Sequence, residues 1–154
     1  MKKGFTIPEL AIIVSVIGIF VFMALPRLSD VKDSSKAAGV QKDLVDLRVA
    51  LEDYYTQVEE YPALMGVEDV LEDVSGRSSD GSQVTFAGVL GRRKMPSTPE
   101  VEGVKRRNTV NDLQDFRESD GSGGWNYNYG ERTGEIHANL PAGIFRQSID
   151  WNEQ

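Results

Sequence analysis

Hydrophobic residues are distributed very unevenly along the chain. Leu10 to Leu25 is an unbroken run of apolar and small residues, and nearly every charge follows Pro26. A helix rises about 1.5 Å per residue, so the segment from Phe5 to Leu25 would span roughly 30 Å, the thickness of a bilayer's hydrocarbon core. We therefore expect residues 5–26 to form a transmembrane helix that joins a polar domain.

A second apolar pattern follows this run. Between residues 40 and 58, apolar side chains recur at intervals of three or four, the spacing of one face of an amphipathic helix. Pro62 blocks a further turn, so the helix should end near Glu60. We predict that residues 27–61 continue the first helix, less regularly between Leu28 and Gly39. The stripe should pack against a core; it comprises Val40, Leu44, Leu47, Leu51, Tyr54 and Val58.

The remaining residues, 62–154, predict a small head domain. A short helix is expected around residues 67–74 and a short strand at 83–87, with polar loops after each. Near the end, apolar and polar residues alternate on both sides of a glycine-containing turn, which predicts a hairpin at about 125–140. The chain should thus have an α+β fold, with one long helix and an antiparallel sheet. The apolar face of the hairpin would carry Trp125, Tyr127, Tyr129, Ile136, Ala138 and Leu140.

The composition excludes several kinds of site. The 154 residues include no cysteine, so zinc–thiolate sites, disulfides and a cysteine nucleophile are excluded. His137 is the only histidine, and it falls on the predicted polar face of the hairpin, where we expect it at the surface. The net charge of −7 argues against a protein held to nucleic acid by phosphate contacts. A membrane-anchored enzyme domain is an alternative that this inventory disfavours.

The start of the chain has a charge pattern of its own. Lys2 and Lys3 precede the apolar run, and the positive-inside rule places that end in the cytoplasm and the head outside it, in the periplasm. Glu9 lies within the apolar helix, where a carboxylate costs on the order of 3 kcal/mol at mid-bilayer and needs a partner. If the chain is cut after Gly4, the new amine of Phe5 could pair with Glu9 of a neighbouring copy and set the axial stagger.

The residues from Lys2 to Leu10, KKGFTIPEL, resemble the processing motif of type IV prepilins. The resemblance implies that a membrane prepilin peptidase removes residues 1–4 by cleavage after Gly4, that Phe5 becomes N-methylated, and that Phe5 and Glu9 act in assembly. Relatives more often carry leucine or isoleucine where this chain has Pro8, although proline in a first turn is tolerated. A Sec signal peptide and a plain membrane anchor are the alternative interpretations.

Two further segments carry a resemblance. Residues 50–55 with Tyr61 and Pro62 resemble the end of the long helix in the major pseudopilins of type II secretion, and the run from Gly123 to Asn139 resembles a C-terminal pattern of pilin-like and pseudopilin-like chains. The resemblance implies a pilin-like fold and a structural subunit of a secretion pseudopilus. The expected partners are further copies, the prepilin peptidase, an inner-membrane assembly platform and minor pseudopilins. The alternatives are a type IV pilin of a surface fibre, for adhesion, motility or DNA uptake, and a minor tip subunit with a binding role.

Side-chain oxygens concentrate before the hairpin, at Asn111, Asp112, Asp115, Glu118 and Asp120. Calcium binds several oxygens on a loop. Major pseudopilins bind calcium in a C-terminal loop and lack the disulfide of many pilins, so the resemblance implies Asp112, Asp115 and Asp120 as calcium candidates. The spacing is not that of an EF-hand, and a solvated acidic loop is the alternative. No other cofactor is expected.

Two basic clusters lie in the head, Arg92–Lys94 and Lys105–Arg107. DNA binding would use such clusters, but no aromatic residue is interleaved with them and their surroundings are acidic. We predict a solvated surface or a contact between subunits, and nucleic acid is not expected as a partner.

Overall fold

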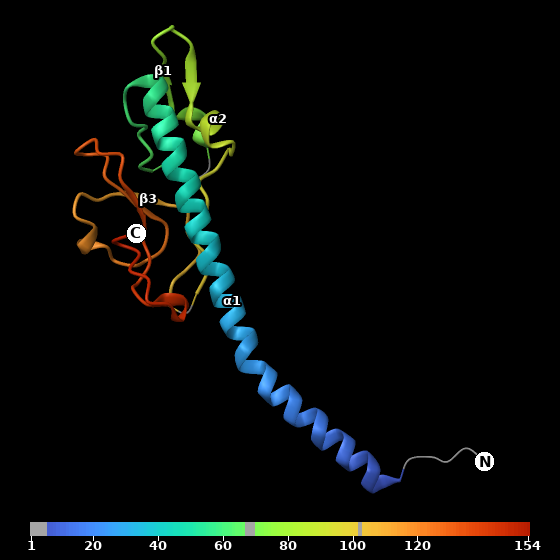
Figure 1. Ribbon diagram of the computed structural model, residues 1–154. Helices are drawn as coiled ribbons and strands as arrows, with labels where there is room; N and C mark the ends of the chain where they lie inside the picture. The colour runs from blue at the N-terminus through green and yellow to red at the C-terminus, as the bar shows by residue number, and fades with distance from the viewer. Residues whose placement is uncertain (1–5, 67–69, 102) are drawn as a thin grey trace.

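One continuous helix, α1 (Ile7–Val58), runs through more than a third of the chain. The computed structural model describes residues 6–66, 70–101 and 103–154, with the backbone alone for residues 24–29. The first half of α1 projects from the head, and the second half lies against it (Figure 1). The irregularity predicted between Leu28 and Gly39 is wrong. That segment has no internal proline or glycine, and its weak periodicity arises because the head buries only Ala37 among residues 30–39, not because the helix is absent.

The end of α1 is a left-handed cap. Glu59 has a φ of 63°, and its backbone N–H donates to the carbonyl oxygen of Tyr55 at 2.7 Å. This conformation satisfies one of the open carbonyls of the last turn, and Pro62 follows it. The predicted end near Glu60 is confirmed.

The head is built from short elements. The two-stranded sheet pairs β1 with β2 antiparallel; in the three-stranded sheet β4 pairs antiparallel with β5 and parallel with β3. The predicted hairpin is therefore confirmed, whereas β3 was not predicted. In chain order the elements after α1 are η1 (Leu71–Asp73), β1 (Ser75–Arg77), β2 (Gln83–Thr85), α2 (Phe86–Leu90), β3 (Val110–Asp112), η2 (Phe116–Glu118), β4 (Trp125–Tyr127), β5 (Ile136–Ala138) and η3 (Ile144–Arg146).

Two predicted elements are shorter than expected. The described part of residues 67–74 contains only the single 3₁₀ turn η1; residues 67–69 lie outside the described residues. The strand predicted at 83–87 ends at Thr85, because the Thr85 hydroxyl accepts a hydrogen bond from the Gly88 N–H at 3.2 Å and caps α2. A side chain that caps a helix thus turns the chain away from the sheet.

The core forms where α1 meets the head. Helix α1 contacts α2, β5 and η3. The predicted apolar stripe is confirmed as buried, with Val58 partly buried at its end. On the helix the buried side chains are Ala37, Val40, Leu44, Leu47, Ala50, Leu51 and Tyr54; the head supplies, among others, Leu64, Leu71, Phe86, Trp125, Tyr127, Ile136, Leu140 and Trp151.

The second face of the hairpin is also buried. Asn126, Asn128, His137 and Asn139 are each less than 5 % exposed, so the prediction that His137 lies at the surface is wrong. The irregular segment 113–123 covers this face: the Phe116 ring lies 4.1 Å from the His137 ring, and Asn126 Nδ2 donates to Ser119 Oγ at 2.9 Å. A polar alternation can therefore mark a face that is buried in the protein, where hydrogen bonds such as that of Asn126 replace those to water.

Leu47→Ala should destabilise the protein by about 2–5 kcal/mol, because Leu47 is fully buried and its truncation leaves a cavity between α1 and the head. Val45→Ala on the same helix is the matched control. Val45 is 58 % exposed, and its loss should change the free energy of unfolding by about 0.5 kcal/mol or less. Thermal unfolding of the detergent-solubilised chain, followed by tryptophan fluorescence, measures both. Equal effects would contradict the arrangement of the core.

Candidate assembly site

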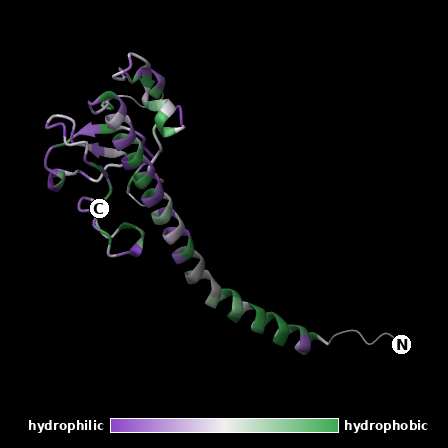
Figure 2. Ribbon diagram, turned by 45° about the horizontal axis from the view of Figure 1, so that its top comes forward, coloured by the Kyte–Doolittle hydropathy of each residue, from purple (hydrophilic) through white to green (hydrophobic). Residues whose placement is uncertain are grey.

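The first half of α1 presents a mostly apolar surface to its surroundings. Figure 2 shows this half as a nearly continuous hydrophobic stretch, while the second half alternates. Large apolar side chains left in water cost free energy, and a contiguous patch of them marks a surface that another partner covers. The exposed side chains are Ile7, Leu10, Ile12, Ile13, Val14, Val16, Ile17, Ile19, Phe20, Val21, Phe22 and Met23.

Glu9 is bound within its own first helical turn. Its Oε2 accepts from the Thr6 backbone N–H at 2.8 Å and from the Thr6 hydroxyl at 2.6 Å. Thr6 is the N-cap and Glu9 the third helical residue, so the carboxylate satisfies a backbone donor that the helix leaves open. Gly4 and Phe5, the predicted processing residues, lie outside the described residues.

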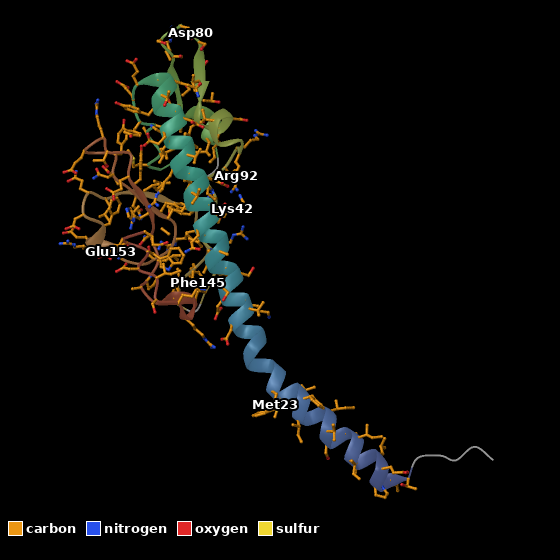
Figure 3. All side chains as sticks on the ribbon, viewed as in Figure 1. Met23, Lys42, Asp80, Arg92, Phe145 and Glu153 are labelled. Atoms are coloured by element: carbon orange, nitrogen blue, oxygen red, sulfur yellow. The ribbon has the colours of Figure 1, made fainter. Side chains whose placement is uncertain are left out.

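The first basic cluster fixes the head to α1 within one chain. Arg92 reaches Asp43 at 2.8 Å and Asp46 at 3.2 Å, both on α1, while Arg93 pairs with Glu72 at 2.9 Å. Figure 3 shows Arg92 beside the helix, at the level of Lys42. For these two arginines, the interpretation as a free surface or a contact between subunits is replaced by an intramolecular role.

The second basic cluster differs from the first. Lys105 and Arg106 are exposed and form no hydrogen bond or ion pair with any residue that the structure describes. Arg107 Nη1 donates to Ser122 Oγ at 3.4 Å, and the Arg107 carbonyl accepts from Thr98. Two cations without a partner among the described residues are therefore available at this turn.

The three calcium candidates stabilise three separate turns. Asp112 Oδ1 accepts from the N–H groups of Tyr129 and Gly130, each at 3.1 Å, and Asp115 Oδ1 accepts from Arg117 N at 3.0 Å. Asp120 Oδ1 accepts from Ser122 N at 3.0 Å and from the Asn139 side chain. Among the described residues, no group of three or more His, Cys, Asp or Glu side chains is placed to hold a metal ion. Calcium binding stays a prediction.

Sequence reasoning missed the role of Asn139, which organises the loop before β4. Its Oδ1 accepts from Ser119 Oγ and Gly121 N, and its Nδ2 donates to Asp120 Oδ1, each at 2.8 Å. The side chain is fully buried. The only signal in the sequence was an asparagine in the polar series of the hairpin, which alone does not show which loop it would bind.

A folded head on a helix whose leading half is apolar and exposed is the architecture of a structural protein that associates through that helix. No helix in residues 6–66, 70–101 and 103–154 carries an apolar stretch long enough to cross a membrane.

Comparison with known proteins agrees with this class. The chain is 30 % identical over 113 residues to the fimbrial protein EcpC of Eikenella corrodens, covering 68 % of this chain and 70 % of that protein. It is 35 % identical over 83 residues to the type IV narrow pilus major component PilA5 of Thermus thermophilus, covering 54 % of this chain and 69 % of that protein. No family profile matches the chain, and no solved structure matches it significantly.

The chain therefore belongs to the type IV pilin family. It is a structural subunit of a type IV pilus-like filament, assembled with other pilin subunits, and it is not an enzyme. The expected α+β fold with a long N-terminal helix is confirmed.

Asp120 should make stability depend on acidity. Hydrogen bonds from the Asn139 side chain, and then from Ser122, hold the pKa of the Asp120 carboxyl below its ordinary value. Its contribution is therefore complete above the ordinary value near 3.8 and is lost as the pH falls through the lower pKa of the folded state. The melting temperature should fall less for Asp120→Asn than for the unchanged chain between about pH 5 and pH 3.

The matched control is Glu118→Gln, an exposed neighbour whose carboxylate accepts no hydrogen bond from the described residues. It should follow the unchanged chain. The same acid dependence in all three proteins would show that the loop does not bind the ionised Asp120.

Proposed function

We propose that this chain is made as a membrane-anchored precursor, cut between Gly4 and Phe5, and assembled through residues 5–26 into the core of the filament. The observation that carries the proposal is the exposed apolar first half of α1, continuous with a second half that is buried in the head. Before assembly the bilayer covers the apolar surface, and after assembly the same surface of other copies covers it.

The length of α1 fits both environments. Its 52 residues correspond to roughly 78 Å, so the head stands well clear of the apolar half. The lysines at positions 2 and 3 favour a cytoplasmic start and a head on the outer side. We propose that the prepilin peptidase, an inner-membrane assembly platform and minor pilins act on the chain in the course of assembly.

Glu9 has a second role in this proposal. Inside an apolar bundle its carboxylate needs a cation, and cleavage creates one at the Phe5 amine. In the isolated subunit the Glu9 carboxylate already accepts hydrogen bonds from Thr6, which partly offset the lack of a cation before the subunit meets a neighbour. Pairing with the amine of the next copy would then fix the stagger between helices.

Two kinds of filament are candidates. The relatives are named as a fimbrial protein and as a pilus component, which favours a surface fibre for adhesion, motility or DNA uptake. The cysteine-free head and the resemblance at Tyr61 and Pro62 favour a type II secretion pseudopilus as the second candidate. A minor subunit at the tip would be present at far fewer copies than the main subunit.

The chain recovered from its native membrane should begin at N-methylated Phe5. Intact-mass analysis and N-terminal sequencing measure this directly. A chain that begins at Met1, or one cut near Ala24, would identify a plain anchor or a Sec signal and would overturn the proposal. The cell fractions also separate the two kinds of filament, since shearing releases a surface fibre whereas a pseudopilus remains in the envelope.

Glu9→Val should leave cleavage intact and reduce filament assembly, because the Phe5 amine of the neighbour would lose its counter-charge in an apolar core. The control is Ser15→Ala, which removes a hydroxyl that bonds only to the Ala11 carbonyl of its own helix. Assembled subunit is measured by quantitative immunoblotting of sheared and sedimented filaments. Normal assembly of the Glu9 variant would refute the proposed charge pairing.

A further inference from the structure

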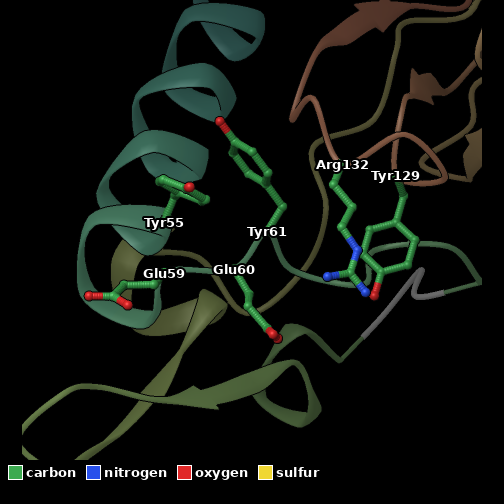
Figure 4. Close-up of a pocket in the computed structure, with 6 residues that line it drawn as sticks. All are labelled: Tyr55, Glu59, Glu60, Tyr61, Tyr129 and Arg132. Atoms are coloured by element: carbon green, nitrogen blue, oxygen red, sulfur yellow. The ribbon is translucent and has the colours of Figure 1, made fainter.

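A small pocket lies at the upper end of the head, where α1 ends. It has a volume of about 220 Å³ and opens between the last turn of the helix and the loop that joins β4 to β5. Figure 4 shows the two rings of the helix end on one side and an arginine beside a tyrosine on the other. The lining residues are Tyr55, Glu59, Glu60, Tyr61, Tyr129 and Arg132.

The walls of the pocket are held in place by packing. The rings of Tyr55 and Tyr61 are stacked, with centroids 4.6 Å apart and planes 27° from parallel. The Tyr61 ring lies directly on Gly134, where any side chain would collide with it. The Tyr61 hydroxyl donates to Glu52 Oε1 at 3.3 Å. The pocket is therefore formed before any partner binds.

The pocket favours a positively charged group. Glu59 and Glu60 line it and form no ion pair with any described residue, and Glu52 adds a third carboxylate behind Tyr61. Burial, and then the charge of Glu52, raise the pKa of the Tyr61 hydroxyl. Among the described residues that line the pocket Arg132 is the single cation, so the acids outnumber it. Aromatic faces beside carboxylates bind ammonium or guanidinium groups.

Matching cations lie at the opposite end of the head. Lys105 and Arg106 follow a turn in which Val101 pairs with Val104, and this turn is tied to α1 by Lys36 Nζ, which donates to the Glu100 carbonyl at 2.8 Å. From position 36 to position 55 the helix rises roughly 28 Å. The basic turn and the acidic pocket are thus too far apart to meet within one chain.

Two different complementary patches at opposite ends of a subunit generate an open helical assembly, whereas one self-complementary patch closes into a dimer. We propose that Arg106, with Lys105 beside it, enters the tyrosine–glutamate pocket of the next copy along the filament. The inference rests on the proposed assembly. The inference goes beyond the proposed assembly by naming the surface of the head that joins consecutive copies.

The absence of cysteine from the chain allows a direct test. The full chain carrying both Glu60→Cys and Arg106→Cys is expressed in its native host, and filaments are sheared, oxidised and separated without reductant. Each subunit then offers one thiol at each end, so the expected product is a ladder of covalent dimers, trimers and higher oligomers. Either single variant should give monomers.

The matched control pairs Arg106→Cys with Asp80→Cys. Asp80 lies at the tip of the turn between β1 and β2, at the same end of the head but outside the pocket (Figure 3). A ladder from the Glu60 pair alone supports the proposal. Filaments that form normally but give no ladder, or a ladder only from the Asp80 pair, would overturn it while leaving filament assembly intact. Failure of the unchanged chain to form filaments would instead count against the proposed function.

Charge reversal gives a second test that needs no oxidation. Glu60→Arg and Arg106→Glu should each lower the yield of assembled filaments by about fivefold, because each variant loses one exposed ion pair at every contact between copies. The double reversal should restore the yield. Both residues are exposed and form no ion pair with the part of the chain that the structure describes, so circular dichroism should show that each variant folds. Single losses without rescue would show that the two side chains act on other partners, such as a free cationic ligand at the pocket.

Discussion

Burial of the apolar stripe of α1 against the head fixes the two parts of the molecule in one arrangement. Leu44, Leu47 and Leu51 are almost completely covered by the head, and they belong to the same unbroken helix as the exposed apolar half. A helix transmits orientation along its length, so every surface of the head keeps a set position relative to the exposed apolar half of α1. Under the proposed assembly through that half, each head would therefore take a set position in the filament.

Polar contacts at the edges of this core set the rotation of the head about α1. Arg146 pairs with Asp30 at 2.9 Å near the lower edge, and Arg92 pairs with Asp43 and Asp46 higher up. Arg48, just beyond Asp46 on α1, donates to the carbonyl oxygens of Ile136 and Gln154. Exposed ion pairs contribute little free energy each. Their effect here is directional, since each joins the head to a defined position on α1.

The sequence predicted those parts of the fold whose signals are local. The stripe of α1 and the alternation of the hairpin repeat every few residues, and the residues concerned bury as expected. Strand β3 could not be predicted, because it pairs in parallel with β4 and depends on a contact that skips residues 113–124. The burial of His137 and Asn139 was missed for the same reason, since a polar, irregular segment covers them.

The functional residues also differ in whether their signal is local in the sequence or depends on the fold. Glu9 was recognisable from its position in an apolar run, which is a local anomaly. The pocket at the end of α1 was not, because Tyr61 comes from the helix end and Gly134 from the hairpin turn, and only the packed head brings them together. Likewise the two basic clusters look alike in sequence, but the fold places acids beside Arg92 and none of the described acids beside Arg106.

Cohesion and register come from different parts of the chain. Apolar contact between helices is strong but non-directional, so it would hold copies together at many different staggers. A repeating filament needs each copy in the same place, and that requires groups whose partners are few and specific. This chain has such groups at both levels: a single carboxylate near the start of the apolar helix, and opposite charges at the two ends of the head. If the proposed contacts form at both levels, the rigid α1 that links them would allow only a stagger that aligns the heads as well as the helices.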